Sequence, residues 1–302
     1  RLELHGHKVL VRARGPPPRI LVDQLPVQPD AELIVGTQEQ DGFWYGLDVH
    51  AASTSNELTY VEIANGGGAG YADVYVRSTG QITITNSLLR NSETYGVAAE
   101  SGASLTGWSD NELRDNVIAG VEVVPNAVRF LDEATTYAGG ATPISVRVAA
   151  GTTSAAGTWP ATDKAYLADW ISIGSAITFA PGLHLRFTQN QYMDIPTGGA
   201  LTALGTATDS IRIVGNEAIA GFWYGIDVHS LTGGNHFAYV DLGYGGAAGY
   251  ANIYIRGTGS MLVENSLLHH SAECAVFVET GGSYTGTAVT YENNTGGTVC
   301  TP

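Results

Sequence analysis

The sequence predicts an all-β solenoid, a chain wound into stacked coils, and three observations lead to this prediction. Short segments in which apolar and polar residues alternate recur along the chain, bounded by Gly, Asn or Ser. Such segments are typical of strands. They follow one another at nearly constant spacing with almost no helical periodicity, which favours coils that each bury an apolar face on their neighbours. The third observation is a long internal repeat.

The repeat joins two halves of the chain. Residues 42–107 align with residues 221–286 at an offset of 179 without a gap, and 32 of the 66 positions are identical. Self-similarity of this kind indicates a duplicated structural unit. We therefore expect a single solenoid over residues 1–302, with repeat units of approximately 1–140 and 141–302.

In each alternating segment we take one apolar residue, called its anchor, to mark the position of the strand along the chain. In the first copy the anchors are 27, 23 and 24 residues apart, about one coil each, and second strands lie between them at 58–63 and 82–85. If the anchors point inward, the residues one and three positions later point outward. The anchors are Leu47, Val74, Val97 and Val121 in the first copy, and Ile226, Ile253, Val276 and Cys300 in the second.

Several stretches resemble the right-handed parallel β-helix of the pectate-lyase-like superfamily, in particular its secreted bacterial β-helix repeat proteins. The resemblance rests on the Trp-containing strands at 44–49 and 223–228, on ITITNSLLRNSETYGV at 82–97, and on 157–182 and 200–215. It covers nearly the whole chain. It implies a right-handed parallel β-helix, a secreted or cell-surface location, and a polysaccharide or surface glycan as partner. It assigns no activity, because this fold hosts lyases, hydrolases, esterases, tailspikes and adhesins.

Charge excludes some partners. Lys and Arg total 14 against 29 Asp and Glu, a net charge of −15, so nucleic acid and anionic membrane surfaces are not expected partners. No run of 18 apolar residues occurs, so we expect no membrane insertion. The first residues carry no signal-peptide pattern and begin within a repeat unit, so a mature or trimmed chain is expected.

Outward positions on neighbouring coils align charged side chains into a ladder. Neighbouring coils are about 4.8 Å apart, so Asp48, Arg77 and Glu100 should stack, with His50 beside them. In a polysaccharide groove, carboxylates would act as acid and base, and arginine would neutralise a uronate or an enolate. Alternatively, the charges only stabilise the sheet face, by a few tenths of a kcal/mol. The catalytic candidates from both copies are Asp48, His50, Arg77, Glu100, Asp227, His229, Arg256 and Glu279.

Aromatic residues form a second group of candidates. Tyr75 and Tyr254 point outward by the same alternation, and exposed rings stack on sugar faces. The candidates for binding substrate in this way are Tyr75, Tyr254, Tyr45 and Tyr224. We expect Trp44 and Trp223 to pack inside instead, since a glycine two residues later allows close packing.

Two further motifs are interpreted as structural. The glycine-rich loops at 66–71 and 245–250 lack the lysine and helix of a phosphate cradle, so tight turns between sheets are expected. Asparagines fit the stacked turn positions common in β-helices, namely Asn86, Asn91, Asn111, Asn116 and Asn265.

Metal sites have little support. The acidic patch of Asp110, Glu112 and Asp115 matches no calcium-loop spacing, so a solvated turn is expected, although calcium stays open. The pairs His5 with His7 and His269 with His270 have no third ligand nearby in sequence. We therefore expect no cofactor and no metal.

The only two cysteines are one coil apart. If Cys300 lies over Val276, it is diagonal to Cys274 and slightly beyond the limit of about 7 Å between Cα atoms for a disulfide. A register slip of one residue would permit the bond. Both outcomes stay open.

Two functions fit these observations, and the sequence does not decide between enzyme and binder. The first is a secreted carbohydrate-interacting β-helix, which would degrade polysaccharide as a lyase or glycoside hydrolase if it is catalytic. The second is a non-catalytic structural or adhesive repeat module of a larger cell-surface protein. No capping helix is recognisable at either terminus, so flanking domains or an oligomer are expected to cover the end coils.

Overall fold

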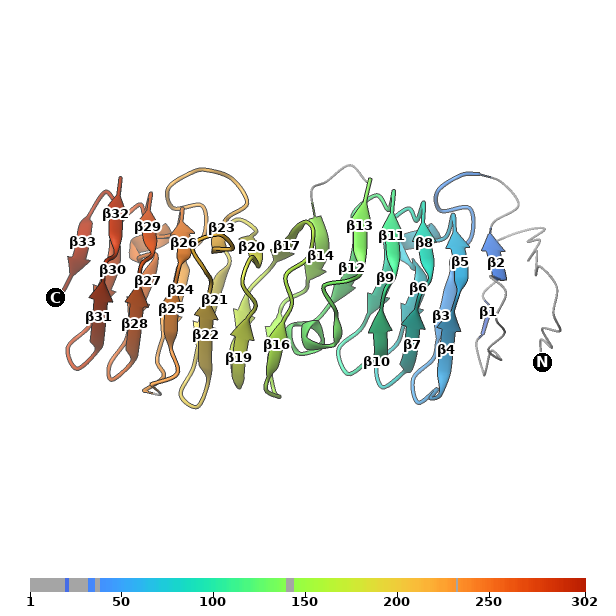
Figure 1. Ribbon diagram of the computed structural model, residues 1–302, viewed down its shortest axis with the longest axis horizontal. Coiled ribbons are helices and arrows are strands. Elements are labelled where there is room, and N and C mark those ends of the chain that lie inside the picture. Colours follow the sequence, from blue (N-terminus) through green and yellow to red (C-terminus); the bar gives the residue numbers. More distant parts are fainter. Residues whose placement is uncertain (1–19, 22–31, 36–38, 140–143, 232) are drawn as a thin grey trace. The chain divides into compact units, whose positions relative to one another are not determined.

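The protein is all-β, and its parallel strands stack coil upon coil as in a β-helix (Figure 1). The computed structural model describes residues 20–21, 32–35, 39–139, 144–231 and 233–302. The chain divides into two compact units. Unit 1 is Arg1–Arg147 with Thr162–Lys164, and unit 2 is Val148–Ala161 with Ala165–Pro302.

Unit 1 carries three parallel sheets. The sheet of the predicted anchors has β1 (Ile20–Leu21), β3 (Leu47–Val49), β6 (Ala72–Val76), β9 (Tyr95–Ala99), β12 (Ala119–Val123) and β14 (Ile144–Val148). The second has β4 (Asn56–Thr59), β7 (Gln81–Thr85) and β10 (Ser104–Ser109). The third has β2 (Glu32–Val35), β5 (Val61–Ala64), β8 (Leu88–Arg90), β11 (Glu112–Arg114) and β13 (Thr136–Ala138).

Unit 2 repeats the three-sheet arrangement. Its anchor sheet has β15 (Gly151–Thr152), β18 (Ile171–Ser172), β21 (Tyr192–Ile195), β24 (Gly225–Val228), β27 (Ile253–Ile255), β30 (Cys274–Val278) and β33 (Gly297–Cys300). The second has β16 (Gly157–Trp159), β19 (Ala176–Phe179), β22 (Ala200–Leu204), β25 (His236–Ala238), β28 (Ser260–Glu264) and β31 (Ser283–Thr287). The third has β17 (Ala165–Ala168), β20 (His184–Phe187), β23 (Ile211–Gly215), β26 (Val240–Gly243), β29 (Leu267–His269) and β32 (Thr290–Glu292).

The predicted anchors are the rungs of the core. In unit 1 Leu47 pairs with Val74, Val74 with Val97, and Val97 with Val121, and all four are at most 1% exposed. Inward-pointing apolar side chains on successive coils therefore stack directly, which buries their surface from water and stabilises the fold.

The last anchor of unit 2 was predicted wrongly. Val276 pairs with Val299, and Cys300 lies beside Phe277 instead. The coil from β30 to β33 is one residue shorter than the spacing of 24 that places Cys300 over Val276. This slip brings the Cα atoms of Cys274 and Cys300 to 6.1 Å, and the two residues form a disulfide.

The tryptophans pack inside, as predicted. Trp44 is 3% exposed and Trp223 is fully buried. Each indole Nε1–H donates to a backbone carbonyl 2.9 Å away, that of Ala64 and that of Gly243. The buried polar atom of each ring is thereby satisfied.

The glycine-rich loops are tight turns, as predicted. They contain the 3-10 turns η1 (Gly68–Gly70) and η3 (Ala247–Gly249), each preceded by a glycine with left-handed backbone. A third 3-10 helix, η2, spans Pro125–Phe130. Glycine is needed at these points because other residues adopt this conformation at a cost.

The asparagines serve the turns as predicted. Asn86, Asn91 and Asn265 have positive φ, which asparagine tolerates better than most residues. Asn111 and Asn116 are buried, and their amides bond backbone groups of the coil below. These residues are occupied in holding the turns.

Candidate functional site

The charged ladder of unit 1 forms as an ion-paired network. Arg77 on β6 donates from Nε and Nη2 to the two carboxylate oxygens of Asp48 on β3, at 2.9 and 3.0 Å. Such two-pronged pairs are the strongest arginine–carboxylate contacts. The Asp48 side chain is only 3% exposed, so the expectation of an open outward carboxylate is corrected, since Arg77 covers it. His50 is 51% exposed and 3.7 Å from Asp48.

Glu100 completes the ladder. It accepts hydrogen bonds from the Tyr75 hydroxyl at 3.0 Å and from the backbone N–H of Ser78 at 2.8 Å, with Arg77 at 3.7 Å. Burial, together with the hydrogen bond to Glu100, raises the pKa of Tyr75 to about 12. The carboxylate thus accepts two hydrogen bonds and takes part in an ion pair, which limits its availability to act as a base.

Unit 2 reproduces these contacts. Arg256 donates to Asp227 at 2.8 Å and lies 3.2 Å from Glu279, which also accepts from the Tyr254 hydroxyl at 3.2 Å. Burial, followed by the hydrogen bond to Glu279, raises the pKa of Tyr254. The predicted candidates therefore come together in each unit as two copies of one network.

One carboxylate was missed by the sequence analysis. Asp194 on β21 pairs in register with Asp227 on β24, and the His229 ring lies 3.7 Å from Asp194 and 3.5 Å from Asp227. Burial raises the pKa of Asp194, although a hydrogen bond from Ser172 opposes this. The sequence feature that could have identified Asp194 is its outward position in the alternating segment 192–195. A carboxyl group of raised pKa beside a second carboxylate is typical of acid–base sites.

Tyrosine rings lie side by side along the anchor sheet of unit 1. The ring centres of Tyr45 and Tyr71 are 5.4 Å apart, and those of Tyr71 and Tyr75 are 5.2 Å apart. The Arg77 guanidinium lies 5.2 Å from the Tyr75 ring centre. We call these three tyrosines the unit 1 column. All three residues are half-buried, so part of each side chain is exposed.

The unit 2 column is longer. It consists of Tyr224, Tyr250, Tyr254 and Phe277, whose consecutive ring centres are 5.3, 5.5 and 4.8 Å apart. Tyr71 and Tyr250 were missed by the sequence analysis. Each is the last residue of a glycine-rich loop, where alternation no longer predicts the side-chain direction.

The metal candidates do not assemble. Asp110 and Asp115 occupy left-handed turn positions, and Glu112 pairs with Arg114 at 3.2 Å. No group of three His, Cys, Asp or Glu side chains that could hold a metal occurs in residues 39–139, 144–231 and 233–302. His5 and His7 lie outside the described residues.

Among the described residues, no helix has the length and apolarity to cross a membrane.

His269 and His270 take part in a different contact. His269 Nε2 lies 2.7 Å from an oxygen of Asp241, and its Nδ1 lies 2.7 Å from Nδ1 of His270. The imidazole rests against Gly243, where a Cβ atom would come within 2.4 Å of the ring. The contact between Asp241 and His269 could not be predicted from their spacing in the sequence, because it depends on the register between two coils.

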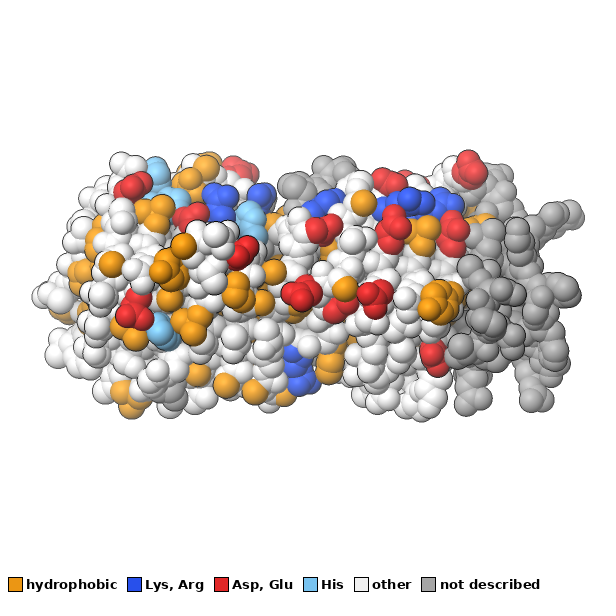
Figure 2. Space-filling view, viewed as in Figure 1, with side chains coloured by type: hydrophobic (Ala, Val, Ile, Leu, Met, Phe, Trp, Pro, Cys, Tyr) orange, Lys and Arg blue, Asp and Glu red, His pale blue; other side chains and the backbone are white. Residues whose placement is uncertain are grey.

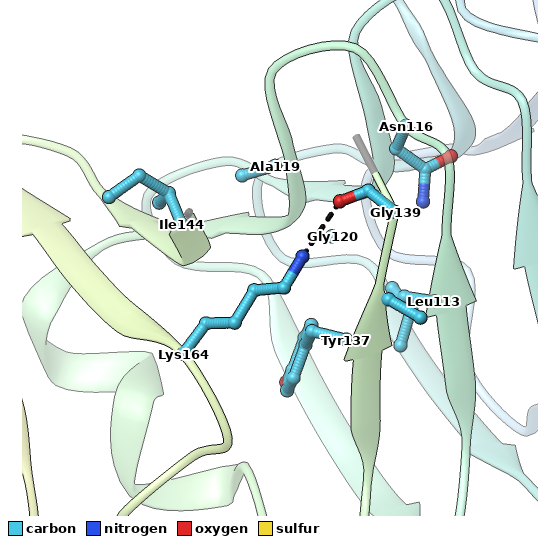
Figure 3. A pocket seen from close by; sticks show the side chains of 9 residues that line it. Leu113, Asn116, Ala119, Gly120, Tyr137, Gly139, Ile144 and Lys164 are labelled. Atoms are coloured by element: carbon cyan, nitrogen blue, oxygen red, sulfur yellow. Dashed lines mark hydrogen bonds between the residues drawn. The ribbon is translucent and has the colours of Figure 1, made fainter. Parts of the chain in front are cut away.

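A small pocket in unit 1 is occupied by a lysine (Figure 3). The Lys164 side chain reaches across it, and its ammonium donates to the carbonyl of Gly139 at 2.7 Å. Tyr137 and Ile144 line the walls. The lysine spans the pocket, so this feature serves packing.

No protein-family model matches the chain, and no curated protein matches it. Solved structures of similar fold include catalytic domains of GH87 alpha-1,3-glucanase. One, an Asp-to-Ala variant in complex with tetrasaccharides, is 12% identical with a TM-score of 0.42. Another, in complex with nigerose, is 13% identical with a TM-score of 0.40. Each match covers 97% of this chain and 61% of the other, so this chain spans less than two thirds of their length. A likeness at this level supports no argument about function.

Proposed function

We propose that the protein is a carbohydrate-binding β-helix and that the two columns are its binding surfaces. The observation that carries the proposal is the unit 2 column, where Tyr224, Tyr250, Tyr254 and Phe277 follow one another at 4.8–5.5 Å along one sheet. Partly exposed rings in a line offer apolar surfaces on which sugar rings stack. The adjoining Arg256 and Glu279 supply groups for hydrogen bonds to hydroxyls.

The contacts favour binding over catalysis in unit 1. Arg77 is held by both oxygens of Asp48, and Glu100 already accepts from Tyr75 and from backbone. Each of these groups is already bonded to another, so none is available to transfer a proton. The recurrence of the network in unit 2 suits a protein that contacts a polymer with repeating chemistry.

Tyr254→Ala tests the binding surface. We expect at least a several-fold loss of affinity for the polysaccharide that the wild-type protein binds. One aromatic contact contributes about 0.5–1.5 kcal/mol in addition to the free energy of burying its apolar surface. Calorimetry with a panel of neutral and acidic polysaccharides measures it. Ile219→Ala is the matched control, since Ile219 is 54% exposed and outside the columns. Equal affinities of the two variants would refute the assignment.

A second candidate, glycoside cleavage in unit 2, is favoured by Asp194. Its raised pKa suits a general acid that donates a proton to a glycosidic oxygen, with Asp227 as the second carboxylate. A product-release screen by mass spectrometry tests this activity. New oligosaccharides that disappear in Asp194→Asn support it. No products, together with retention of the polymer, would leave a binding or adhesive module.

The location proposed for the protein is secreted or cell-surface. The Cys274–Cys300 disulfide supports it, because such bonds persist mainly in oxidising compartments. Free thiols on protein recovered from its native source would contradict this location.

A further inference from the structure

A basic cluster lies on a different sheet of unit 2 from the columns. His184 on β20 pairs in register with Arg212 on β23, which pairs with Asp241 on β26, and Arg186 follows two residues after His184 on the same face. Figure 2 shows arginine or lysine, histidine and acidic side chains gathered in the upper part of this unit, where Figure 1 places β20, β23 and β26.

The carboxylate in this cluster is already shared. Asp241 forms an ion pair with Arg212, whose Nε lies 3.1 Å away, and contacts His269 Nε2 at 2.7 Å. Burial by itself would raise the pKa of Asp241, but the hydrogen bond with His269 and the charge of Arg212 lower it below its usual value. Asp241 therefore has little capacity left to neutralise a second arginine.

Arg186 has no carboxylate partner in the part of the chain that the structure describes. Among the described residues it forms no ion pair, and its Nε–H donates to His184 Nε2 at 3.3 Å. Its register neighbours are Leu167 and Val214. Burial, with the nearby charge of Arg212, lowers the pKa of Arg186. By contrast, a carboxylate pairs with each of Arg77, Arg90, Arg114, Arg212 and Arg256.

His184 is oriented as a hydrogen-bond donor. Burial, with the charges of Arg186 and Arg212, lowers the pKa of His184 to about 4, so the ring is neutral at pH 7. A guanidinium only donates, so Nε2 of His184 is the acceptor of the Arg186 bond and the proton sits on Nδ1. That N–H remains to donate to a ligand.

We propose that Arg186, Arg212 and His184 form a binding site for an oxyanion, a carboxylate or sulfate group. Arg186 supplies its free Nη edge, Arg212 the nitrogens that Asp241 does not use, and His184 its Nδ1–H. Planar guanidinium forks suit such groups. The ligand would neutralise an arginine that forms no ion pair among the described residues.

The two arginines of the cluster are not repeated. At the offset of 179, His7 stands in place of Arg186 and Leu33 in place of Arg212. His184 corresponds to His5, and Asp241 to Glu62. Glu62 pairs with Arg90 at 2.6 Å in unit 1, so charge is balanced there without a ligand. Because the first copy has no arginine at either position, the two arginines are not needed to build the solenoid, which supports a role in binding.

Calorimetry on the whole chain at low ionic strength and pH 7 tests the site, with sodium glucuronate, sodium sulfate and neutral glucose as separate probes. We expect one anion to bind and glucose not to displace it. Arg186→Gln should weaken binding on the order of tenfold, because charge-assisted hydrogen bonds are lost. Arg186→Lys should retain part of the affinity. The stronger of the two anions identifies the group.

Two controls make the result decisive. Arg114→Gln removes the same charge from an exposed arginine of unit 1 and should leave anion binding unchanged. Tyr254→Ala should also leave it unchanged, so a failure of the proposed carbohydrate surface is distinguishable from a failure of this site. Binding of neither anion, or equal weakening by Arg186→Gln and Arg114→Gln, would overturn the proposal.

Discussion

At the scale of single residues, Asp73 shows how the two copies differ. Its side chain is fully buried, and one oxygen accepts from the N–H of Gly66 at 2.8 Å, while the other has no partner among the described residues. Burial raises the pKa of this carboxyl well above 3.8. The equivalent residue of unit 2 is Asn252, whose amide accepts from Gly245 N–H at 2.8 Å and donates to the His269 carbonyl at 2.9 Å.

Asp73→Asn should therefore stabilise the protein. A buried polar atom without a partner costs about 1–3 kcal/mol, and the amide supplies the missing donor. The folded state holds a proton that the unfolded state releases above pH 3.8, so wild-type stability falls as pH rises through the raised pKa. Urea midpoints from pH 4 to 8 check this, with the converse Asn252→Asp as control. A lower midpoint for Asp73→Asn at pH 7 would contradict it.

At the scale of elements, β33 depends on its covalent link. Val299 is 44% exposed, and the side chains of β31, the last strand of the second sheet, are largely exposed too. Few buried apolar contacts hold such a strand. The Cys274–Cys300 bond closes a loop of 26 residues, which ties β33 to β30.

Cys300→Ser should release β33 while the inner coils stay folded. Closing a loop of this length stabilises by about 3 kcal/mol in the chain-entropy model, and most of that effect should appear locally. Amide hydrogen exchange measures it, with β27 as the internal reference. Unchanged protection of residues 297–300 would show that backbone pairing alone suffices.

At the scale of the whole molecule, periodicity predicted the fold, the anchors and the pairing of Asp48, Arg77 and Glu100. These follow from near-constant coil length and two-residue alternation, which are local properties. The contacts of Arg212 and His269 with Asp241 were not predicted, because they join strands through coils of unequal length. The shorter last coil misplaced Cys300 for the same reason. Register, rather than residue type, was the missing information.

Because Gly243 has no side chain, the imidazole of His269 packs directly against strand β26. Because a Cβ there would come within 2.4 Å of the ring, a single added methyl group would act as a wedge between histidine and strand. It would lift His269 from Asp241 and free that carboxylate to turn toward the arginines. The absence of a side chain at position 243 thus keeps His269 in contact with Asp241 and determines how much of the Asp241 charge is available to the arginines.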